Sequence, residues 1–232
     1  MTAPDGARSA SLSTVPLAGR FFLLVAGVLS AVAPGCRSTP PVSEPPAAGS
    51  PAPPAFAAEP IVRVGVALGD TALALGSGDR WWVHEAGVSR PIAVVDGEPG
   101  WRVVRLPFET ALRLRRPDGW LSQPHVGPLV AASIGGASIE AAGVAYPGAI
   151  EVSLRPDGTL TGVNVVPLET YLEGVVPREL GRPGADARQA QLSQAVAART
   201  YALKRLGSRS DLGFDLYGSV LDQAYQGLPE PG

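Results

Sequence analysis

The sequence predicts an α+β protein whose strands come first and whose helices follow. Short apolar runs recur between residues 61 and 131, with Gly, Asp and Pro between them. This spacing is typical of a barrel- or sandwich-like antiparallel unit. Two further runs flank a Pro-Asp-Gly sequence at residues 156–158, and two segments with helical periodicity come after them. We therefore expect a β-rich N-terminal unit, then a β-hairpin followed by two helices.

Composition and charge exclude several classes of protein. The chain has 232 residues, with 19 Lys and Arg against 21 Asp and Glu, and its net charge is −2. The chain therefore lacks the excess of basic residues that is typical of a general nucleic-acid binder, and we expect no nucleic-acid partner. A hydrophobic fraction of 45% excludes a wholly disordered chain. One Cys and two His are too few for a closed four-ligand zinc site unless carboxylates contribute.

The N-terminus has the features of an export signal. An uncharged apolar run at residues 21–33 follows two arginines. It is shorter than the about 20 apolar residues that cross a bilayer, and it is typical of the core of a secretory signal. The sequence Ala33-Pro34-Gly35-Cys36 comes next and resembles a bacterial lipobox. Cleavage before Cys36 with acylation of its thiol would anchor the chain in the membrane; the alternative is an ordinary cleaved signal with an incidental cysteine.

We favour the lipoprotein interpretation for residues 1–36 and predict an exported, membrane-anchored chain that faces the periplasm or cell wall. Proline, alanine and serine dominate residues 37–60, which show no apolar period. Such a segment is expected to be a disordered, extended linker. It would hold the following domain away from the membrane, as suits a cell-wall substrate, but it is equally typical of a generic lipoprotein spacer.

Residues 61–145 form the predicted β-rich region, which contains all four tryptophans: Trp81, Trp82, Trp101 and Trp120. A tryptophan can stack on a sugar, but packing in the core or at an edge is the more common role, and we favour packing for each one. We expect His84 and His125 to be surface or hydrogen-bonding residues rather than ligands. The expected strands cover residues 61–67, 81–83, 91–95, 101–106, 111–115 and 127–131.

A hairpin is predicted for residues 149–155 and 159–166, because Pro sets φ in the turn, Asp caps it and Gly adopts the left-handed conformation. Pro167 then opens a short helix. We expect Gly174 and Pro177 to end that helix. Its predicted buried face has the spacing i, i+3, i+4, i+7 and consists of Leu168, Tyr171, Leu172 and Val175.

The second helix is predicted to run from residue 187 to 206, with an Asp186–Gln189 capping box at its start and Gly207 at its end. Arg199 lies inside its apolar stripe. A guanidinium on a buried face requires a carboxylate partner; alternatively, Arg199 extends to the edge of the stripe. Periodicity leaves both open. The stripe consists of Leu192, Val196, Leu203 and Leu206, and the acidic residues nearest in sequence are Glu169, Glu173 and Glu179.

Two blocks of sequence resemble the stage II sporulation protein D / amidase enhancer LytB (SpoIID/LytB) family. They are residues 164–180 (NVVPLETYLEGVVPREL) and 194–202 (QAVAARTYA). Residues 146–152 resemble the strand that opens the family's domain, and 223–227 (QAYQG) resemble its Gln-x-Tyr-x-Gly block. We predict that residues 146–232 are the N-terminal part of such a domain. Because the family's domain continues beyond this block, we expect the chain to be C-terminally truncated, which puts its activity in doubt.

The resemblance implies a lytic enzyme of peptidoglycan. Members of the sporulation branch cleave between N-acetylmuramic acid and N-acetylglucosamine in glycan strands stripped of stem peptides by an amidase. The glutamate of the Val-Pro-x-Glu motif falls on Glu179, which is the expected catalytic residue. The arginine of the Ala-Arg-Thr-Tyr block falls on Arg199, and Arg199, Tyr201 and Gln194 are the expected substrate-binding residues. Peptidoglycan glycan strands are the expected partner, and a cell-wall amidase is a further candidate.

One protein carboxyl group is enough for this chemistry. Glycoside hydrolases divide the work between two carboxylates, whereas a lytic transglycosylase uses the 6-hydroxyl of muramic acid as the nucleophile and forms a 1,6-anhydro product. The single acid must be protonated near neutral pH, which requires an apolar setting. Val175, Val176 and Leu180 flank Glu179 and are candidates for that setting. We also expect Glu179 and Arg199 to approach each other across one groove.

Some members bind zinc through a Cys/His cluster near the Gln-x-Tyr-x-Gly block. Residues 213–222 contain neither Cys nor His, so we expect no metal and no cofactor.

A non-catalytic cell-wall-binding or amidase-enhancing lipoprotein is the rival interpretation. A β-rich solute-binding lipoprotein is a third, which the Ala-Arg-Thr-Tyr helix disfavours.

Overall fold

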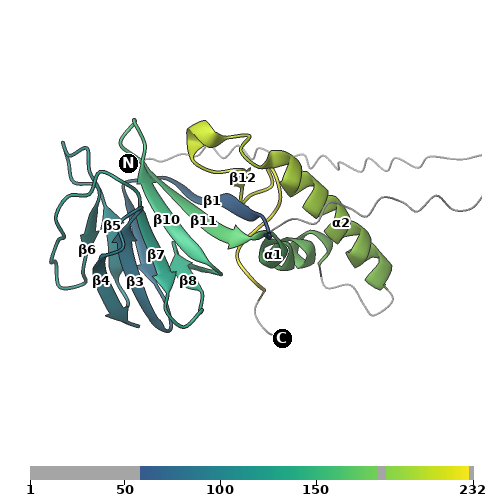
Figure 1. Ribbon diagram of the computed structural model, residues 1–232, viewed down its shortest axis with the longest axis horizontal. Helices are drawn as coiled ribbons and strands as arrows, with labels where there is room; N and C mark the ends of the chain where they lie inside the picture. The colour runs from purple at the N-terminus through teal and green to yellow at the C-terminus, as the bar shows by residue number, and fades with distance from the viewer. Residues whose placement is uncertain (1–57, 182–186, 230–232) are drawn as a thin grey trace, which may run out of the picture. The chain divides into compact units, whose positions relative to one another are not determined.

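The computed structural model describes residues 58–181 and 187–229 (Figure 1). Within these residues, sheet A has the strand order β12-β1-β11-β10-β7-β3-β4 and sheet B the order β6-β5-β2-β8-β9. The strands of sheet A are β1 (Ile61–Asp70), β3 (Arg80–Glu85), β4 (Pro91–Asp96), β7 (Leu129–Ser133), β10 (Ala149–Leu154), β11 (Leu160–Pro167) and β12 (Leu216–Tyr217). Those of sheet B are β2 (Ala72–Gly76), β5 (Trp101–Val104), β6 (Arg113–Arg115), β8 (Ile139–Ala141) and β9 (Val144–Tyr146). The helices are α1 (Leu168–Leu180) and α2 (Arg188–Arg205), with a 3-10 turn at Ser210–Leu212.

This architecture confirms the α+β prediction, with strands first and the two helices after the hairpin. Each of the six runs expected in the β-rich region overlaps a strand. The sequence did not indicate β2, β8, β9 or β12. The segment that contains β8 and β9 is rich in Ala and Gly, which have weak strand preference, so pairing with neighbouring strands decides their conformation.

The two sheets face each other across a common apolar core. Trp81 on β3 and Trp101 on β5 are both buried. Their rings meet edge to face with the centroids 6.3 Å apart and an interplanar angle of 80°, an arrangement that aromatic pairs prefer. The packing role expected for these two tryptophans is confirmed. Trp82 and Trp120 differ, because they remain 38% and 43% exposed and are therefore not core residues.

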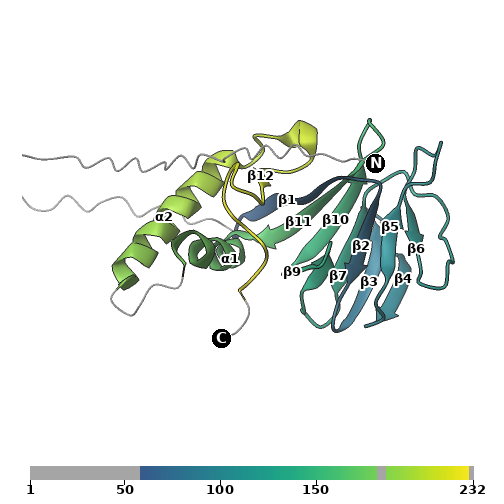
Figure 2. The same cartoon turned by 180° about the vertical axis from the view of Figure 1, so that it is seen from behind.

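Strand β1 joins the β-rich region to the later part of the chain. It pairs antiparallel with β11 from Ile61 opposite Pro167 to Asp70 opposite Leu160, and its middle pairs in parallel with β12. Figures 1 and 2 show β1 beside β11 in both views. Strands from both sides of residue 145 thus form one sheet, and the helices that follow β11 start from that sheet.

The hairpin that leads into the helices has the predicted turn. Strands β10 and β11 pair in register from Ala149 opposite Val165 to Leu154 opposite Leu160. In the turn, the Asp157 carboxylate accepts a hydrogen bond from the Thr159 N–H at 2.9 Å. Gly158 has φ = +83°, a conformation that a side chain would disfavour.

Helix α1 follows β11 directly, and Pro167 stands immediately before its first residue. Its predicted apolar face is buried. The predicted end at Gly174 and Pro177 was wrong, because α1 continues to Leu180 with Pro177 inside it. Pro177 removes one helix hydrogen bond, yet the helix continues for three residues beyond it. Gly174 serves a close contact, described below, rather than a helix end.

Helix α2 has nearly the predicted bounds, but its predicted buried stripe was wrong. Leu192 and Val196 are exposed, whereas Ala198 and Ala202 are buried. Small side chains let a helix approach its neighbour closely, so α2 packs through its alanines. Asp186 of the expected capping box lies outside the described residues. In the part of the chain that the structure describes, no helix is both long and apolar enough to cross a membrane.

Replacing Gly174 by alanine should destabilise the protein. A Cβ atom at this position would lie 2.5 Å from the carbonyl oxygen of Gly227 and 2.6 Å from the ring of Tyr225. Helix preference favours alanine by about 1 kcal/mol, but overpacking costs about 1–3 kcal/mol, and here both neighbours belong to a packed segment. We expect a lower free energy of unfolding, measured by denaturant titration.

Gly78→Ala is the matched control, because a Cβ there meets no atom within 4 Å. Its free energy of unfolding should stay within about 0.5 kcal/mol of the parent protein. Equal stability of both variants would contradict the close contact at Gly174.

Candidate functional site

A polar group in the core fixes the chain segment that follows α2. Asn164 on β11 is fully buried. Its side-chain nitrogen donates to the carbonyl oxygens of Pro147 and Ala149, at 2.7 and 3.1 Å. Its side-chain oxygen accepts a hydrogen bond from the Tyr225 hydroxyl at 2.8 Å. Tyr225 of the Gln-x-Tyr-x-Gly block is therefore tied to sheet A.

The same segment holds helix α1. The Tyr171 hydroxyl donates to the Gln223 side-chain oxygen at 3.1 Å, and the rings of Tyr171 and Tyr225 lie 4.8 Å apart. Burial raises the pKa of both tyrosines, so both remain protonated and can donate. Gln223, Tyr225 and Gly227 thus act in packing, which explains their spacing of two residues.

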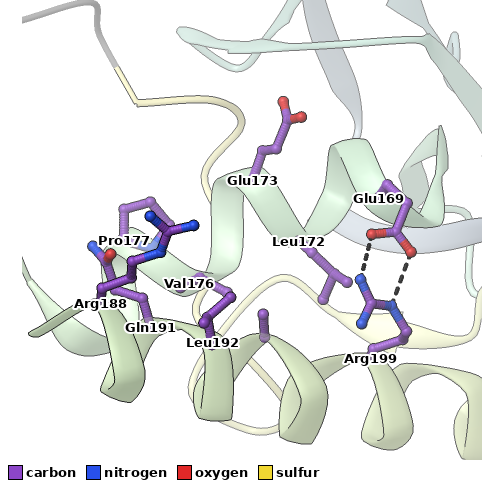
Figure 3. Close-up of a pocket in the computed structure, with 10 residues that line it drawn as sticks. Glu169, Leu172, Glu173, Val176, Pro177, Arg188, Gln191, Leu192 and Arg199 are labelled. Carbon is purple, nitrogen blue, oxygen red and sulfur yellow. Dashed lines mark hydrogen bonds and ion pairs between the residues drawn. The ribbon is translucent and has the colours of Figure 1, made fainter.

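A pocket of about 500 Å³ lies between α1 and α2 (Figure 3). Its apolar lining includes Leu172 and Val176 from α1 and Leu192 from α2. Charged side chains lie at both of its ends, and Figure 3 shows Glu173 pointing away from the pocket's ion pair. These charged residues are Glu169, Glu173, Arg188 and Arg199.

The ion pair joins Arg199 to Glu169 and connects the two helices. Arg199 Nε lies 2.9 Å from Glu169 Oε1, and its terminal nitrogen lies 2.5 Å from Oε2. The Arg199 hydrogen bonds hold the pKa of Glu169 below its ordinary value. The two side chains are 38% and 53% exposed, so solvent limits the pair to at most about 1 kcal/mol. Of the two alternatives left open for Arg199, the structure shows a carboxylate partner, Glu169, although the guanidinium is only partly buried.

Glu179 lies in the last turn of α1 and is exposed. Its carboxylate accepts a hydrogen bond from the side-chain nitrogen of Gln194 on α2. Ten residues separate it from Glu169, about 15 Å along a helix, and it does not line the pocket that contains Arg199. The structure brings Glu179 to Gln194, and the expected approach of Glu179 to Arg199 is not found.

Helical geometry explains this separation. Gln194 and Arg199 are five residues apart on α2, and five residues turn an α-helix by about 500°, which leaves the two side chains about 140° apart. One helix face therefore meets Glu179 while another meets Glu169. Among the described residues, none encloses the Glu179 carboxylate in the expected apolar setting, because Glu179 is exposed.

Tyr201 is engaged by a buried acid that the sequence did not single out. Its hydroxyl donates to Asp222 Oδ1 at 2.6 Å. The Asp222 side chain is completely enclosed and also contacts Arg209 at 3.0 Å and the Tyr217 N–H at 2.9 Å. Burial alone would raise the pKa of Asp222, but the hydrogen bonds from Tyr201, Tyr217 and Arg209 outweigh it and lower the pKa. The role of Tyr201 in substrate binding remains a prediction.

Sequence reasoning did not select Glu173, Arg188 or Asp222 as site residues. The spacing of Glu169 and Glu173, four residues apart, was the available signal for the pocket, because such residues share a helix face. Asp222 carried no signal, since its partners lie on α2, just after α2 and on β12. Within residues 58–181 and 187–229, the structure shows no group of three or more His, Cys, Asp or Glu side chains arranged to hold a metal ion.

Residues 156–231 match the family model SpoIID, described as Stage II sporulation protein. This part of the chain is similar to the SpoIID family. The match runs from the hairpin turn through α1 and α2 and includes the segment that follows α2, which we call the closing segment. It confirms the resemblance found in the sequence. No curated protein and no solved structure was found to match the chain. The SpoIID match supports a cell-wall-related function.

Asp222→Asn should destabilise the SpoIID domain at neutral pH. The amide keeps the shape but leaves Arg209 without a buried counter-charge, at a cost of about 1–3 kcal/mol. Because the folded pKa of Asp222 is lowered, its stabilisation is present above the unfolded value of about 3.9. It is lost as the pH falls through the folded pKa.

The stability difference between the parent protein and Asp222→Asn should therefore shrink below about pH 4. Urea titrations at pH 7 and at pH 3 measure it. The exposed Asp211 provides the control, and Asp211→Asn should match the parent at both pH values. A pH-independent difference for Asp222→Asn would show that the carboxylate charge has no such role.

Proposed function

We propose that this protein is an exported peptidoglycan lytic transglycosylase with Glu179 as its general acid and base. It would cleave the linkage between N-acetylmuramic acid and N-acetylglucosamine in glycan strands stripped of stem peptides. The hydrogen bond between Gln194 and Glu179 carries the proposal, because it joins one residue from each of the two family blocks. The SpoIID match over this region supports it further.

The proposed reaction needs only the Glu179 carboxyl group. In its protonated form, Glu179 gives a proton to the glycosidic oxygen as the bond from the anomeric carbon to that oxygen breaks. The muramic acid 6-hydroxyl oxygen forms the new bond to the anomeric carbon, and its proton passes to the carboxylate of Glu179. No water is consumed, and the acid is regenerated. Gln194 donates an N–H to the carboxylate and so orients it.

The α1–α2 pocket suits the stripped glycan. Removal of a stem peptide leaves a free carboxylate on the lactyl group of muramic acid. Arg188 and Arg199 bring two guanidinium groups to the pocket, and guanidinium groups bind carboxylates through paired hydrogen bonds. Arg199 would exchange Glu169 for the substrate carboxylate at low cost, because the existing pair is largely exposed.

Glu179→Gln should abolish turnover without removing substrate binding. The amide keeps the size of the side chain but cannot supply the proton. General acid–base assistance contributes about 10²–10⁴-fold, and a sole acid and base should lie at or above the top of that range. Amidase-stripped peptidoglycan is the substrate, and mass spectrometry of the released products measures 1,6-anhydro-N-acetylmuramic acid ends.

Glu140→Gln is the matched control, since Glu140 is an exposed carboxylate on β8 that does not line the α1–α2 pocket. It should keep most of the activity. Near-parental turnover of Glu179→Gln would refute the assignment, and products with reducing ends would mean that water is the nucleophile.

The rival function is a non-catalytic wall-binding or amidase-enhancing lipoprotein. The exposure of Glu179 outside the α1–α2 pocket favours it, because an acid that must be protonated near neutral pH needs an apolar setting. This function predicts binding to stripped glycan without release of anhydro products. It also predicts that a cell-wall amidase strips glycan strands faster when this protein is added to it.

Export and anchoring are proposed from the sequence around Cys36, which lies outside the described residues. Mass spectrometry of the membrane fraction should find an acylated peptide that begins at Cys36. Cys36→Ala should move the protein out of the membrane fraction, because the thiol that carries the lipid is lost. A mature N-terminus at another residue, with Cys36 unmodified, would exclude a lipoprotein.

A further inference from the structure

Two further pockets lie away from the helices. They are found where β4 is the edge strand of sheet A and β6 is the edge strand of sheet B. Figures 1 and 2 show β4 and β6 at the same end of the two sheets. The pockets have volumes of about 370 and 390 Å³. Ile92 on β4 and Trp120 line both of them. The two pockets therefore adjoin, and we call them together the Trp120 groove.

Trp120 is held in a defined position although it is 43% exposed. Its carbonyl oxygen accepts a hydrogen bond from the Arg116 N–H at 2.9 Å. The main-chain N–H of Trp120 donates to the Asp118 carboxylate at 3.0 Å. The Arg116 guanidinium lies 5.7 Å from the centroid of the indole ring and forms an ion pair with Asp118. A ligand that packs on this ring would order few new degrees of freedom, which favours binding.

Planar polar side chains border the groove on both sides of Trp120. Glu85, Arg90 and Gln123 lie in one pocket, and Asp96 and Glu98 lie in the other. These groups can both donate and accept hydrogen bonds. Ile92 supplies the apolar surface between them.

Glu85 is positioned from the neighbouring chain segment. Its two carboxylate oxygens accept hydrogen bonds from the Gly127 N–H at 2.8 Å and from His125 Nδ1 at 2.9 Å. The His125 hydrogen bond, followed by that of Gly127, holds the pKa of Glu85 below its ordinary value. The groove therefore presents a fixed, ionised acceptor beside an exposed aromatic ring.

We propose that the Trp120 groove binds a carbohydrate chain. The C–H face of a sugar ring packs on an indole, and hydroxyl groups at its rim pair with carboxylate, amide and guanidinium groups; both kinds of partner are present here. The class of glycan, an N-acetylhexosamine chain, rests on the proposed function. The groove lies outside the SpoIID match, and none of its pocket residues lines the α1–α2 pocket. It would hold the glycan at a second point and so raise the effective concentration of strand near the helices.

Titration calorimetry with a hexamer of N-acetylglucosamine tests this proposal. The protein is the full chain with Cys36→Ser. The parent protein should bind the hexamer, and Trp120→Ala should weaken binding at least about tenfold, which corresponds to about 1.4 kcal/mol, because the ring face that packs on the sugar is lost. Trp120→Phe should bind with intermediate affinity, because it keeps a smaller ring. Unchanged thermal unfolding of both variants shows that the fold is intact.

Trp82→Ala is the matched control. Trp82 is exposed to a similar extent, 38% against 43%, but it lines neither pocket of the groove. Its affinity for the hexamer should equal that of the parent protein. Equal losses in the two alanine variants would overturn the proposal, as would hexamer binding that Trp120→Ala leaves unchanged.

Two further outcomes separate this proposal from the proposed function. Glu179→Gln should bind the hexamer like the parent protein, so a failure of the catalytic assignment leaves the groove intact. Absence of carbohydrate binding would overturn the groove proposal even if the protein cleaves stripped peptidoglycan. Binding of an extended peptide along the edge strand β4 in place of any carbohydrate would also overturn it.

Discussion

The hydrogen bond from Tyr225 to Asn164 fixes the segment on which the position of α1 depends. Asn164 is fully buried on β11, and its side-chain nitrogen donates to two backbone carbonyl oxygens. Its side-chain oxygen is also buried and therefore needs a hydrogen-bond donor. Tyr225 supplies that donor and packs against Tyr171 of α1. Gly174 lets α1 approach this segment closely. Sheet, helix and closing segment thus form one unit around a small polar core.

Apolar packing, rather than the ion pair between Glu169 and Arg199, holds α1 against α2. Glu169 and Arg199 are too exposed to contribute much stability, whereas Ala198 and Ala202 are buried. Apolar packing sets the distance between the helices, and the charges at the pocket remain available for a ligand. Asp222 differs because it is enclosed, and its hydrogen bonds hold the closing segment against α2.

The two surfaces that we propose for glycan binding lie in different parts of the fold. The α1–α2 pocket combines guanidinium groups with apolar walls, and the Trp120 groove combines an aromatic ring with planar polar side chains. Sheet A connects them, since β4 borders the groove while β11 leads into α1. A polymer such as a glycan chain can contact two such places at once, and each contact strengthens the other.

Local chemistry in the sequence determined the α+β order, the β10–β11 turn and the face of α1. Each of these depends on neighbouring residues: Pro-Asp-Gly selects its turn, and helical spacing selects a face. Tertiary packing decided the rest. It carried α1 through Pro177, it buried alanines instead of Leu192 and Val196 on α2, and it assigned Glu169 to Arg199 and Gln194 to Glu179. The rotation of α2 about its axis governs the contacts that α2 makes with α1. That rotation depends on which side chains allow close approach to α1 and sheet A, a property of two surfaces together that no single segment encodes.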